Sequence, residues 1–357
     1  MEKNILLHGA TNFGSTNYGD FLYGELLYSF FIHKGYNVRF FQPSNFFEKK
    51  ITEYNKHSEF KERNADLLVY IPGGYFGEGH NASLKENLLK FLRYMPVGLK
   101  ARFSHIPIIV IGIGAGPNKS RILRCAIKMI CDTAIFVTTR DSISFNTLKS
   151  ISPKGNIMET GDLIITQNWK SEKNILQKID EKYKLKEDNE KILLVHYNHS
   201  KDALEKFAIG IKDFLKKNEH YKIVVASDSK LYEENIFFDR FETIIERECT
   251  HFLYDSPEEM TALLNIVDCV LTCKLHVGVV ASTLGASVIV AACHPEKTKR
   301  FYQQIGESQR CCSLDTTTGL EISEMLELYC DQKIHINHAL IEEASKSWLY
   351  LEEYLGD

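Results

Sequence analysis

The fold of this chain is decided by strand-to-helix junctions, of which the clearest is CVLTCKLHVGVVAS, residues 269–282. Its first residues predict a buried strand, and the small residues that follow His276 predict a closely packed helix. Lys274 and His276 lie between the two, directly after the strand. A lone histidine is more often structural, but one beside a lysine at a helix N-terminus favours a site for a phosphorylated or carboxylated ligand.

Similar alternations of short β-branched runs and helical patterns occur along the chain in two series. The expected strands are residues 4–9, 36–42, 65–71, 106–113 and 134–139, then 191–197, 221–227, 249–254, 269–273 and 287–293. Such alternation favours parallel sheets with helices on both faces. A charged stretch that begins near residue 168 interrupts the rhythm and predicts a linker with a polar helix.

We therefore expect an α/β protein with two Rossmann-like domains facing a central cleft. The N-terminal domain is predicted over residues 1–168, the linker over 169–189 and the C-terminal domain over 190–357. A final amphipathic helix over 337–354 is expected to pack back on the N-terminal domain. This division agrees with the length of 357 residues, which exceeds what one ordinary hydrophobic core accommodates.

Composition excludes several classes of protein. The net charge of -4 gives no reason to expect a nucleic-acid partner. No apolar run is long enough for a membrane span or a signal peptide, so we expect a cytoplasmic protein. The nine cysteines are an odd, scattered set without a CxxC pair, which predicts a reduced compartment, no disulfide framework and no zinc site.

Ligands of open α/β sheets bind beyond the carboxyl ends of the strands, so polar residues there are candidate site residues. The loop after the first expected strand carries Asn17 and Asp20, and the glycine-rich loop 72–80 carries Glu78 and His80. Neither loop fits a P-loop or a dinucleotide fingerprint. Arg140 follows the fifth expected strand, where it fits either a bidentate anion contact or a surface pair with Asp141.

Taken in order, these segments resemble the polysaccharide pyruvyl transferase family over nearly the whole chain. The carriers of the resemblance are residues 17–20 (NYGD), 73–77 (GGYFG), 112–117 (GIGAGP), 140–144 (RDSIS), 161–162 (GD), 274–278 (KLHVG), 284–286 (LGA) and Lys297. The family is similar in fold to GT-B glycosyltransferases and uses phosphoenolpyruvate to build pyruvate ketals on cell-surface sugars. Its members usually carry Arg-Leu-His where this chain has Lys274, Leu275 and His276.

The resemblance implies a donor site on the C-terminal domain and an acceptor side on the N-terminal domain. Phosphoenolpyruvate has a phosphate and a carboxylate, so several groups should converge on it. We expect these to be Arg140, Lys274, Leu275, His80 and Lys297.

The catalytic acid is expected to be His276, which would protonate the enol methylene carbon, because a group that titrates near neutrality suits this step. Asp20, and after it Glu78, is expected to help deprotonate the sugar hydroxyls, with Asn17 and Tyr75 contacting the acceptor. No metal-ligand spacing is present, so we expect phosphoenolpyruvate as co-substrate with neither a metal nor a cofactor.

A further segment, residues 85–128, is strongly basic. Between residues 81 and 130 there are nine Lys or Arg and one acid, Glu86, interleaved with leucines and aromatic residues. Two interpretations stay open: a surface that docks on an anionic membrane, or a core helix with solvated lysines. Docking at the inner face of the plasma membrane would suit a lipid-linked acceptor such as a polyprenyl-diphosphate-linked oligosaccharide.

Two alternative functions also stay open. One is a nucleotide-sugar glycosyltransferase of the GT-B type, in which Glu258 or Glu259 would hold a ribose. The other is a non-catalytic protein that binds an anionic glycan or lipid, which the lysine at position 274 makes plausible.

Overall fold

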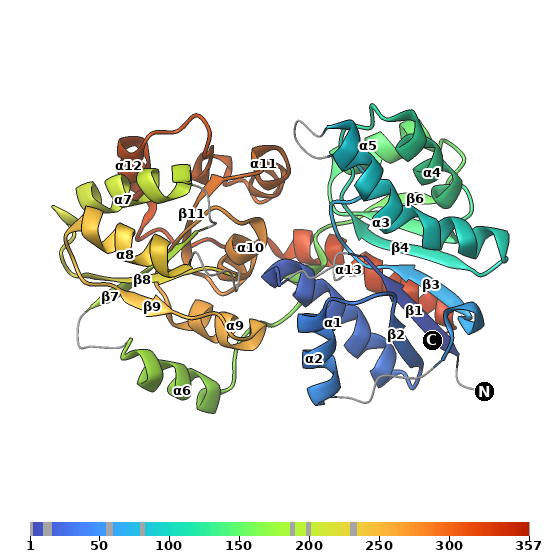
Figure 1. The fold of residues 1–357 in the computed structure, drawn as a ribbon, viewed down its shortest axis with the longest axis horizontal. Coiled ribbons are helices and arrows are strands. Elements are labelled where there is room, and N and C mark those ends of the chain that lie inside the picture. Colours follow the sequence, from blue (N-terminus) through green and yellow to red (C-terminus); the bar gives the residue numbers. More distant parts are fainter. Residues whose placement is uncertain are drawn as a thin grey trace. The chain divides into compact units, whose positions relative to one another are not determined.

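The computed structural model describes residues 3–9, 16–54, 60–78, 83–185, 190–197, 201–228 and 234–356. The chain forms two compact units (Figure 1). Unit 1 comprises Met1–Thr166 together with Ile341–Asp357, and unit 2 comprises Gln167–Leu340.

Unit 1 is built on a parallel six-stranded sheet of order β2-β1-β3-β4-β5-β6. Its strands are β1 (Asn4–His8), β2 (Asn37–Phe40), β3 (Leu67–Tyr70), β4 (Ile108–Ile113), β5 (Phe136–Thr139) and β6 (Ile157–Glu159). Its helices are α1 (Tyr18–His33), α2 (Asn45–Tyr54), α3 (Leu84–Phe103), α4 (Arg121–Cys131), α5 (Ser142–Ile151) and α13 (His338–Leu355). Two 3₁₀ turns, Glu62–Asn64 and Leu163–Thr166, complete it.

Unit 2 has a second parallel six-stranded sheet, of order β12-β11-β10-β7-β8-β9. Its strands are β7 (Lys191–His196), β8 (Tyr221–Ala226), β9 (Thr250–Phe252), β10 (Cys269–Thr272), β11 (Ser287–Ala292) and β12 (Cys311–Ser313). Its helices are α6 (Lys173–Tyr183), α7 (Lys201–Leu215), α8 (Glu234–Ile245), α9 (Pro257–Ile266), α10 (Leu275–Thr283), α11 (Pro295–Gln304) and α12 (Gly319–Tyr329). A 3₁₀ turn, Ser308–Arg310, precedes β12.

The predicted α/β fold with two parallel sheets is confirmed, and all ten expected strands are present. The central strands are buried on both faces, as the β-branched runs predicted, because helices cover both sides of each sheet. The sequence did not reveal β6 and β12, which have three residues each and end their sheets. Strands this short show no useful periodicity.

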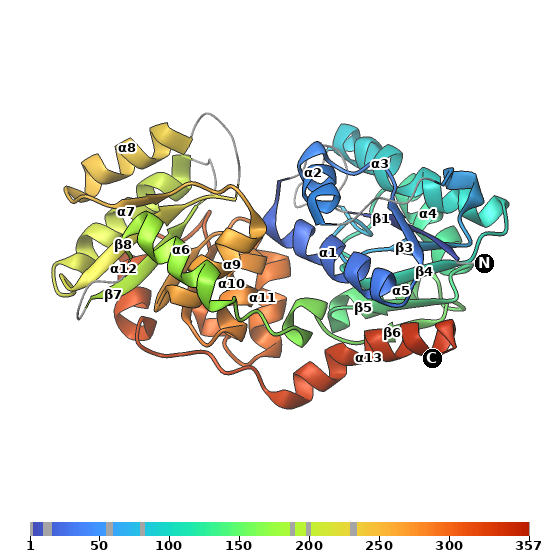
Figure 2. The same ribbon diagram turned by 90° about the horizontal axis from the view of Figure 1, so that it is seen from below.

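The predicted linker and the C-terminal end of the chain each contain a helix, α6 and α13. Within the charged stretch, α6 packs on α9 in unit 2, where Lys178 and Lys182 pair with Glu259. At the other end of the chain, α13 belongs to unit 1 and lies beside β5 and β6 (Figure 2). There the Ser347 hydroxyl contacts the hydroxyls of Thr138 and Thr160 at 3.0 and 2.9 Å.

Candidate functional site

In unit 1, the predicted residues Asn17 and Asp20 lie together at the start of α1. Asn17 is the N-cap, and its side-chain oxygen accepts a hydrogen bond from the backbone N–H of Asp20 at 3.1 Å. This bond fixes Asp20 in the first helical turn, where the positive end of the helix dipole stabilises a carboxylate. Asp20 is close enough to Tyr75 and Tyr94 to add to the rise in their pKa values that burial causes.

Tyr75, the predicted acceptor contact, has its side chain in the core of unit 1. Its ring stacks on Tyr94, with ring centroids 4.5 Å apart, and its hydroxyl donates to the backbone carbonyl of Ile71. Burial, with the neighbouring Tyr70 and Tyr94, raises the pKa of Tyr75 well above its usual value. The phenol is therefore a neutral structural group, and its contact with an acceptor stays a prediction.

Glu78 joins the loop after β3 to the start of α4. Its carboxylate accepts a hydrogen bond from the backbone N–H of Ser120, the N-cap residue of α4. Beside it, Lys90 Nζ donates to the carbonyl of Gly77 at 2.6 Å. Glu78 is thus engaged in holding two segments together. His80, the other candidate from this loop, lies outside the described residues.

Arg140 lies at the end of β5 in a buried polar cluster. Its Nε is 3.8 Å from Asp141 Oδ2, and the hydroxyl of Tyr23 donates to both carboxylate oxygens of Asp162, at 2.7 and 2.8 Å. Burial opposes the charge of Arg140, but Tyr23, Asp162 and Asp141 outweigh it and raise the arginine pKa. The guanidinium lies against Gly114, where a Cβ would stand 2.7 Å from its Nη2.

This cluster changes what is expected of Arg140. Its charge is already compensated inside the protein by two carboxylates, so an incoming anion would compete with them. The sequence did not reveal Tyr23 as a partner. Asp162 is one of the two residues, 161–162, that carried part of the resemblance. The sequence did not predict that Asp162 would bind Tyr23 and lie near Arg140.

In unit 2, Lys274 is the N-cap residue of α10 and makes no side-chain capping bond. The Thr272 hydroxyl accepts from the backbone N–H of Lys274 at 3.0 Å, which fixes the turn between β10 and α10. The first turn of α10, which includes Leu275 and His276, therefore presents N–H groups that the N-cap side chain does not cover. Leu275 is itself buried, so what it offers a ligand is its backbone.

The lysine side chain is held by an acid that follows β8, two strands away from β10 in the sheet. Lys274 Nζ lies 3.4 Å from Oδ1 of Asp228, which follows β8 and is buried. Burial of Lys274 works against its charge, but Asp228 and the Cys273 thiol raise the pKa of Lys274 overall. Lys274 therefore stays protonated at neutral pH.

His196, the last residue of β7, lies beside Thr272 of the adjacent strand β10. It is fully buried, its Nδ1 is 3.2 Å from the Thr272 hydroxyl, and its Nε2 has no hydrogen-bond partner among the described residues. Burial lowers the pKa of His196 to about 4, so the ring is neutral at physiological pH. His196 and Asp228 were missed in the sequence, where the signal was a polar residue at or just after a strand end.

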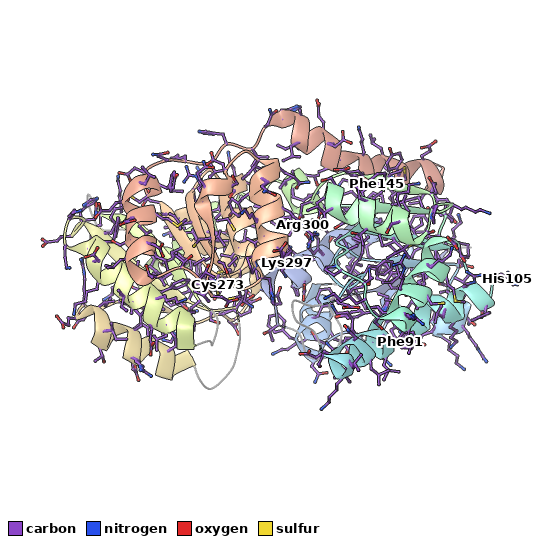
Figure 3. All side chains as sticks on the ribbon, turned by 90° about the horizontal axis from the view of Figure 1, so that it is seen from above. Phe91, His105, Phe145, Cys273, Lys297 and Arg300 are labelled. Atoms are coloured by element: carbon purple, nitrogen blue, oxygen red, sulfur yellow. The ribbon has the colours of Figure 1, made fainter. Side chains whose placement is uncertain are left out.

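Lys297 lies in α11, which follows β11, and Lys274 follows β10, the strand that pairs with β11. The pKa of Cys293, just after β11, is lowered mainly by a hydrogen bond with Cys273; burial opposes this shift, and both lysines add to it. Cys273 and Lys297 are labelled in this part of unit 2 in Figure 3. The carboxyl ends of β10 and β11 thus present two cations beside the α10 N-terminus, an arrangement suited to a doubly anionic ligand.

Two units, each built on a parallel six-stranded sheet with helices on both faces, give the chain a GT-B-like fold. Solved structures agree. UDP-GlcNAc 2-epimerase from Neisseria meningitidis is 12% identical, with a TM-score of 0.65 and coverage of 99% of this chain and 100% of that one. The corresponding epimerase from Methanocaldococcus jannaschii is 11% identical, with the same TM-score and coverage. A glycosyltransferase from Rickettsia africae is 11% identical, with a TM-score of 0.54 and 99% coverage of both chains.

Such low identities establish the fold alone. In sequence, the profile of the polysaccharide pyruvyl transferase family matches residues 17–295. The chain belongs to this family, as its motifs predicted. No curated protein matches the chain in sequence.

Proposed function

We propose that this protein transfers the pyruvyl group of phosphoenolpyruvate to a sugar of a surface polysaccharide or its lipid-linked precursor, forming a pyruvate ketal. The observation that carries the proposal is the start of α10, where Lys274 stands at the helix N-terminus after β10, while Lys297 lies in α11, which follows the adjacent strand β11. Phosphoenolpyruvate carries a phosphate and a carboxylate, which these two cations and the backbone N–H groups would bind.

The proposed reaction needs a proton donor and a base. A proton added to the methylene carbon of phosphoenolpyruvate makes the adjacent carbon electrophilic, and one sugar hydroxyl adds to it. The C–O bond to phosphate then breaks, a second hydroxyl of the same sugar closes the ring, and inorganic phosphate is released. The two protons lost by the hydroxyls balance the proton taken up by carbon and the one taken up by phosphate or base.

His276 is the proposed acid, because it lies in the first turn of α10 directly beside the proposed anion site. Asp20 is the proposed base. Asp20 lies in the first turn of α1, and Glu78, whose carboxylate accepts from the backbone N–H of Ser120, is the second candidate. No cofactor or metal takes part in the proposed reaction.

The test is incubation of the chain with phosphoenolpyruvate and a panel of free and lipid-linked glycosides, with mass spectrometry for the pyruvate mass increment. We expect the increment together with phosphate release. His276→Ala should abolish both, whereas His335→Ala, at an exposed histidine that precedes α13, should change neither. A near-normal rate for His276→Ala would remove the acid assignment.

A thermal-shift measurement separates this function from nucleotide-sugar transfer. Ligand binding to the folded state raises the melting temperature, so phosphoenolpyruvate should stabilise the protein and uridine diphosphate should not. The pairing of Glu259 with Lys178 and Lys182 supports this expectation, because a ribose would have to displace two lysines from that carboxylate. Stabilisation by uridine diphosphate alone would contradict the proposal.

A further inference from the structure

The outer side of α3 and α4 exposes an unusual set of large apolar side chains. The two helices pack side by side on unit 1 (Figures 1 and 2). Their inner sides are buried in the usual way, with Met95 and Val97 on α3 and Leu123 and Ile127 on α4. On the outer side, Leu84 is 86% exposed and Phe103 is 70% exposed. Leu88, Leu89, Leu92 and Ile122 are more than half exposed.

Three of the exposed leucines lie on one side of α3. Leu84, Leu88 and Leu92 follow one another at intervals of four along α3, which places them on one side of the helix. An outer helix of a globular protein normally turns charged and polar side chains to water. Several adjacent exposed leucines therefore mark a surface that another apolar phase covers.

The charges on the same two helices indicate what kind of apolar surface would bind there. Exposed basic residues accompany the leucines: Lys85, Arg93, Lys100, Arg121 and Arg124. The one acid of α3, Glu86, is engaged in the capping box with Ser83. We call the exposed side of these two helices, with its leucines and basic residues, the α3–α4 face. It is apolar and cationic at once, which is the combination that binds anionic lipid surfaces.

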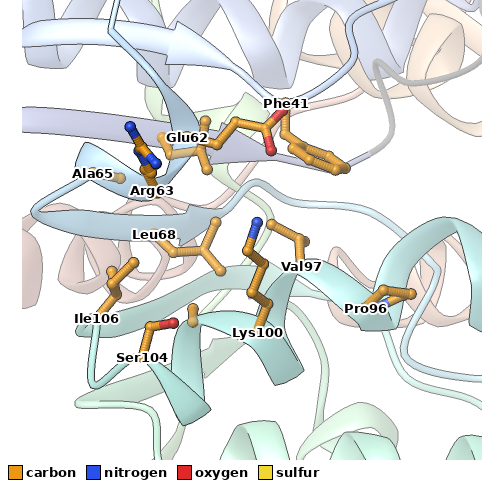
Figure 4. Close-up of a pocket in the computed structure, with 12 residues that line it drawn as sticks. Phe41, Glu62, Arg63, Ala65, Leu68, Pro96, Val97, Lys100, Ser104 and Ile106 are labelled. Atoms are coloured by element: carbon orange, nitrogen blue, oxygen red, sulfur yellow. The ribbon is translucent and has the colours of Figure 1, made fainter.

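A cavity of about 150 Å³ borders this face (Figure 4). Pro96 and Lys100 of α3 line it and are exposed, and the rest of its lining is mostly apolar, including Leu6, Leu68 and Val97. A mostly apolar hollow, with Glu62 and Arg63 also in its lining, can accept a short length of hydrocarbon chain. A second copy of the protein is a poorer occupant, because a symmetric contact through this face would bring cations against cations.

We propose that the α3–α4 face binds the surface of a membrane that contains anionic lipids. No helix in the described part of the chain is long and apolar enough to cross a membrane. The leucines enter the boundary between headgroups and acyl chains, and the basic residues contact the lipid phosphates. This binding does not depend on the proposed reaction, because it uses none of the residues assigned to it.

The test is co-sedimentation of the whole protein with phosphatidylcholine vesicles, with and without phosphatidylglycerol. We expect binding that requires phosphatidylglycerol and weakens with added salt. Reversing two charges, Arg93→Glu with Lys100→Glu, should reduce the partition coefficient by roughly tenfold or more. Leu88→Ser with Leu92→Ser should reduce it comparably, because these side chains no longer enter the lipid.

Matched controls carry the same changes elsewhere. Leu320→Ser with Leu328→Ser changes two equally exposed leucines of α12, and Lys154→Glu with Lys333→Glu reverses two exposed lysines outside the α3–α4 face. Circular dichroism confirms that every variant is folded. Equal binding to both kinds of vesicle, or equal loss in test and control variants, would overturn the proposal. So would a dimer in solution that the leucine variants dissociate while vesicles bind neither form.

Discussion

The side chain most informative for function is Lys274, because it takes the position of the family's usual arginine and has its own acidic partner. An arginine presents a planar fork that can hold a carboxylate or phosphate with two parallel bonds, whereas a lysine presents a point charge. Here Asp228 holds that charge at 3.4 Å. A bound anion must therefore share or displace an internal carboxylate.

Replacing Lys274 with methionine should raise the KM for phosphoenolpyruvate by roughly 10- to 100-fold, because a charged hydrogen bond of about 1.5–3 kcal/mol is lost. The same change should leave Asp228 buried without its partner, so the melting temperature should fall as well. Lys274→Arg should keep activity and lower the KM, since the guanidinium can bind the donor with two bonds. Steady-state kinetics with varied phosphoenolpyruvate measures both.

Lys299→Met is the control for this pair, because Lys299 is an exposed lysine of α11 to which no donor contact is assigned. It should leave the KM unchanged. If Lys274→Met bound phosphoenolpyruvate as well as the unchanged protein, Lys274 would be a structural partner of Asp228 and not a donor ligand.

Sequence reasoning found Lys274 but not His196 or Asp228, and the cause is the strand order. The rule that ligands lie beyond strand ends works on each junction separately. Which junctions become neighbours depends on the order β10-β7-β8, which brings together residues far apart in the chain. Local patterns do not contain this order, so the buried partners of a predicted residue stay hidden.

At the level of elements, the glycine-rich loops have a packing role that their sequence did not disclose. The glycine-rich loop after β3 was singled out for Glu78 and His80, yet a Cβ on Gly77 would overlap the backbone of Gly116 in the loop after β4. No side-chain rotation relieves contact with backbone. Gly77 is therefore needed for the close approach of two loops.

Gly77→Ala should destabilise unit 1 by about 2 kcal/mol or more, because backbone must shift to admit the methyl group. Gly74→Ala is the matched control in the same loop. Its Cβ would stand 3.9 Å from Arg140, an ordinary contact, so its free energy of unfolding should change little. Urea unfolding followed by circular dichroism compares the two. Equal free energies of unfolding for the two variants would mean that the loops after β3 and β4 can move apart without loss of stability.

The final helix is another element whose contacting residues the sequence did not predict. Its apolar spacing predicted α13, and small residues decide where it packs: Gly161 lies against Ala344, and Ser347 reaches Thr138 and Thr160. Small residues permit close packing but do not identify a partner in advance. A helix is thus easier to predict than its neighbour.

At the level of the whole molecule, the described residues of each unit include one fully buried histidine, which is neutral in the folded state. Burial lowers the pKa of His8 in unit 1 from 6.5 to about 3, and that of His196 in unit 2 from 6.5 to about 4. Below pH 6.5 the two histidines bind protons in the unfolded chain but stay neutral in the folded units. The stability contributed by these neutral rings is therefore complete above pH 6.5 and declines as the pH falls.

The decline should reach about 1.4 kcal/mol per pH unit for each histidine. It should continue to about pH 4 for His196 and to about pH 3 for His8. The chain's two tryptophans report the units separately, because Trp348 belongs to unit 1 and Trp169 to unit 2. Fluorescence-detected urea unfolding of Trp169→Phe and Trp348→Phe therefore follows one unit at a time.

In the Trp348→Phe background, His196→Gln should reduce the pH dependence of unit 2 between 6.5 and about 4, since one titrating histidine is gone while His251, whose pKa burial also lowers, remains. In the Trp169→Phe background, His8→Gln should do the same for unit 1, although the lost packing among Tyr70, Phe41 and Tyr94 lowers its stability at every pH. His335→Gln, at an exposed site, is the control and should leave both slopes unchanged. An unaltered slope in either test variant would assign the acid sensitivity of that unit to its carboxylates instead.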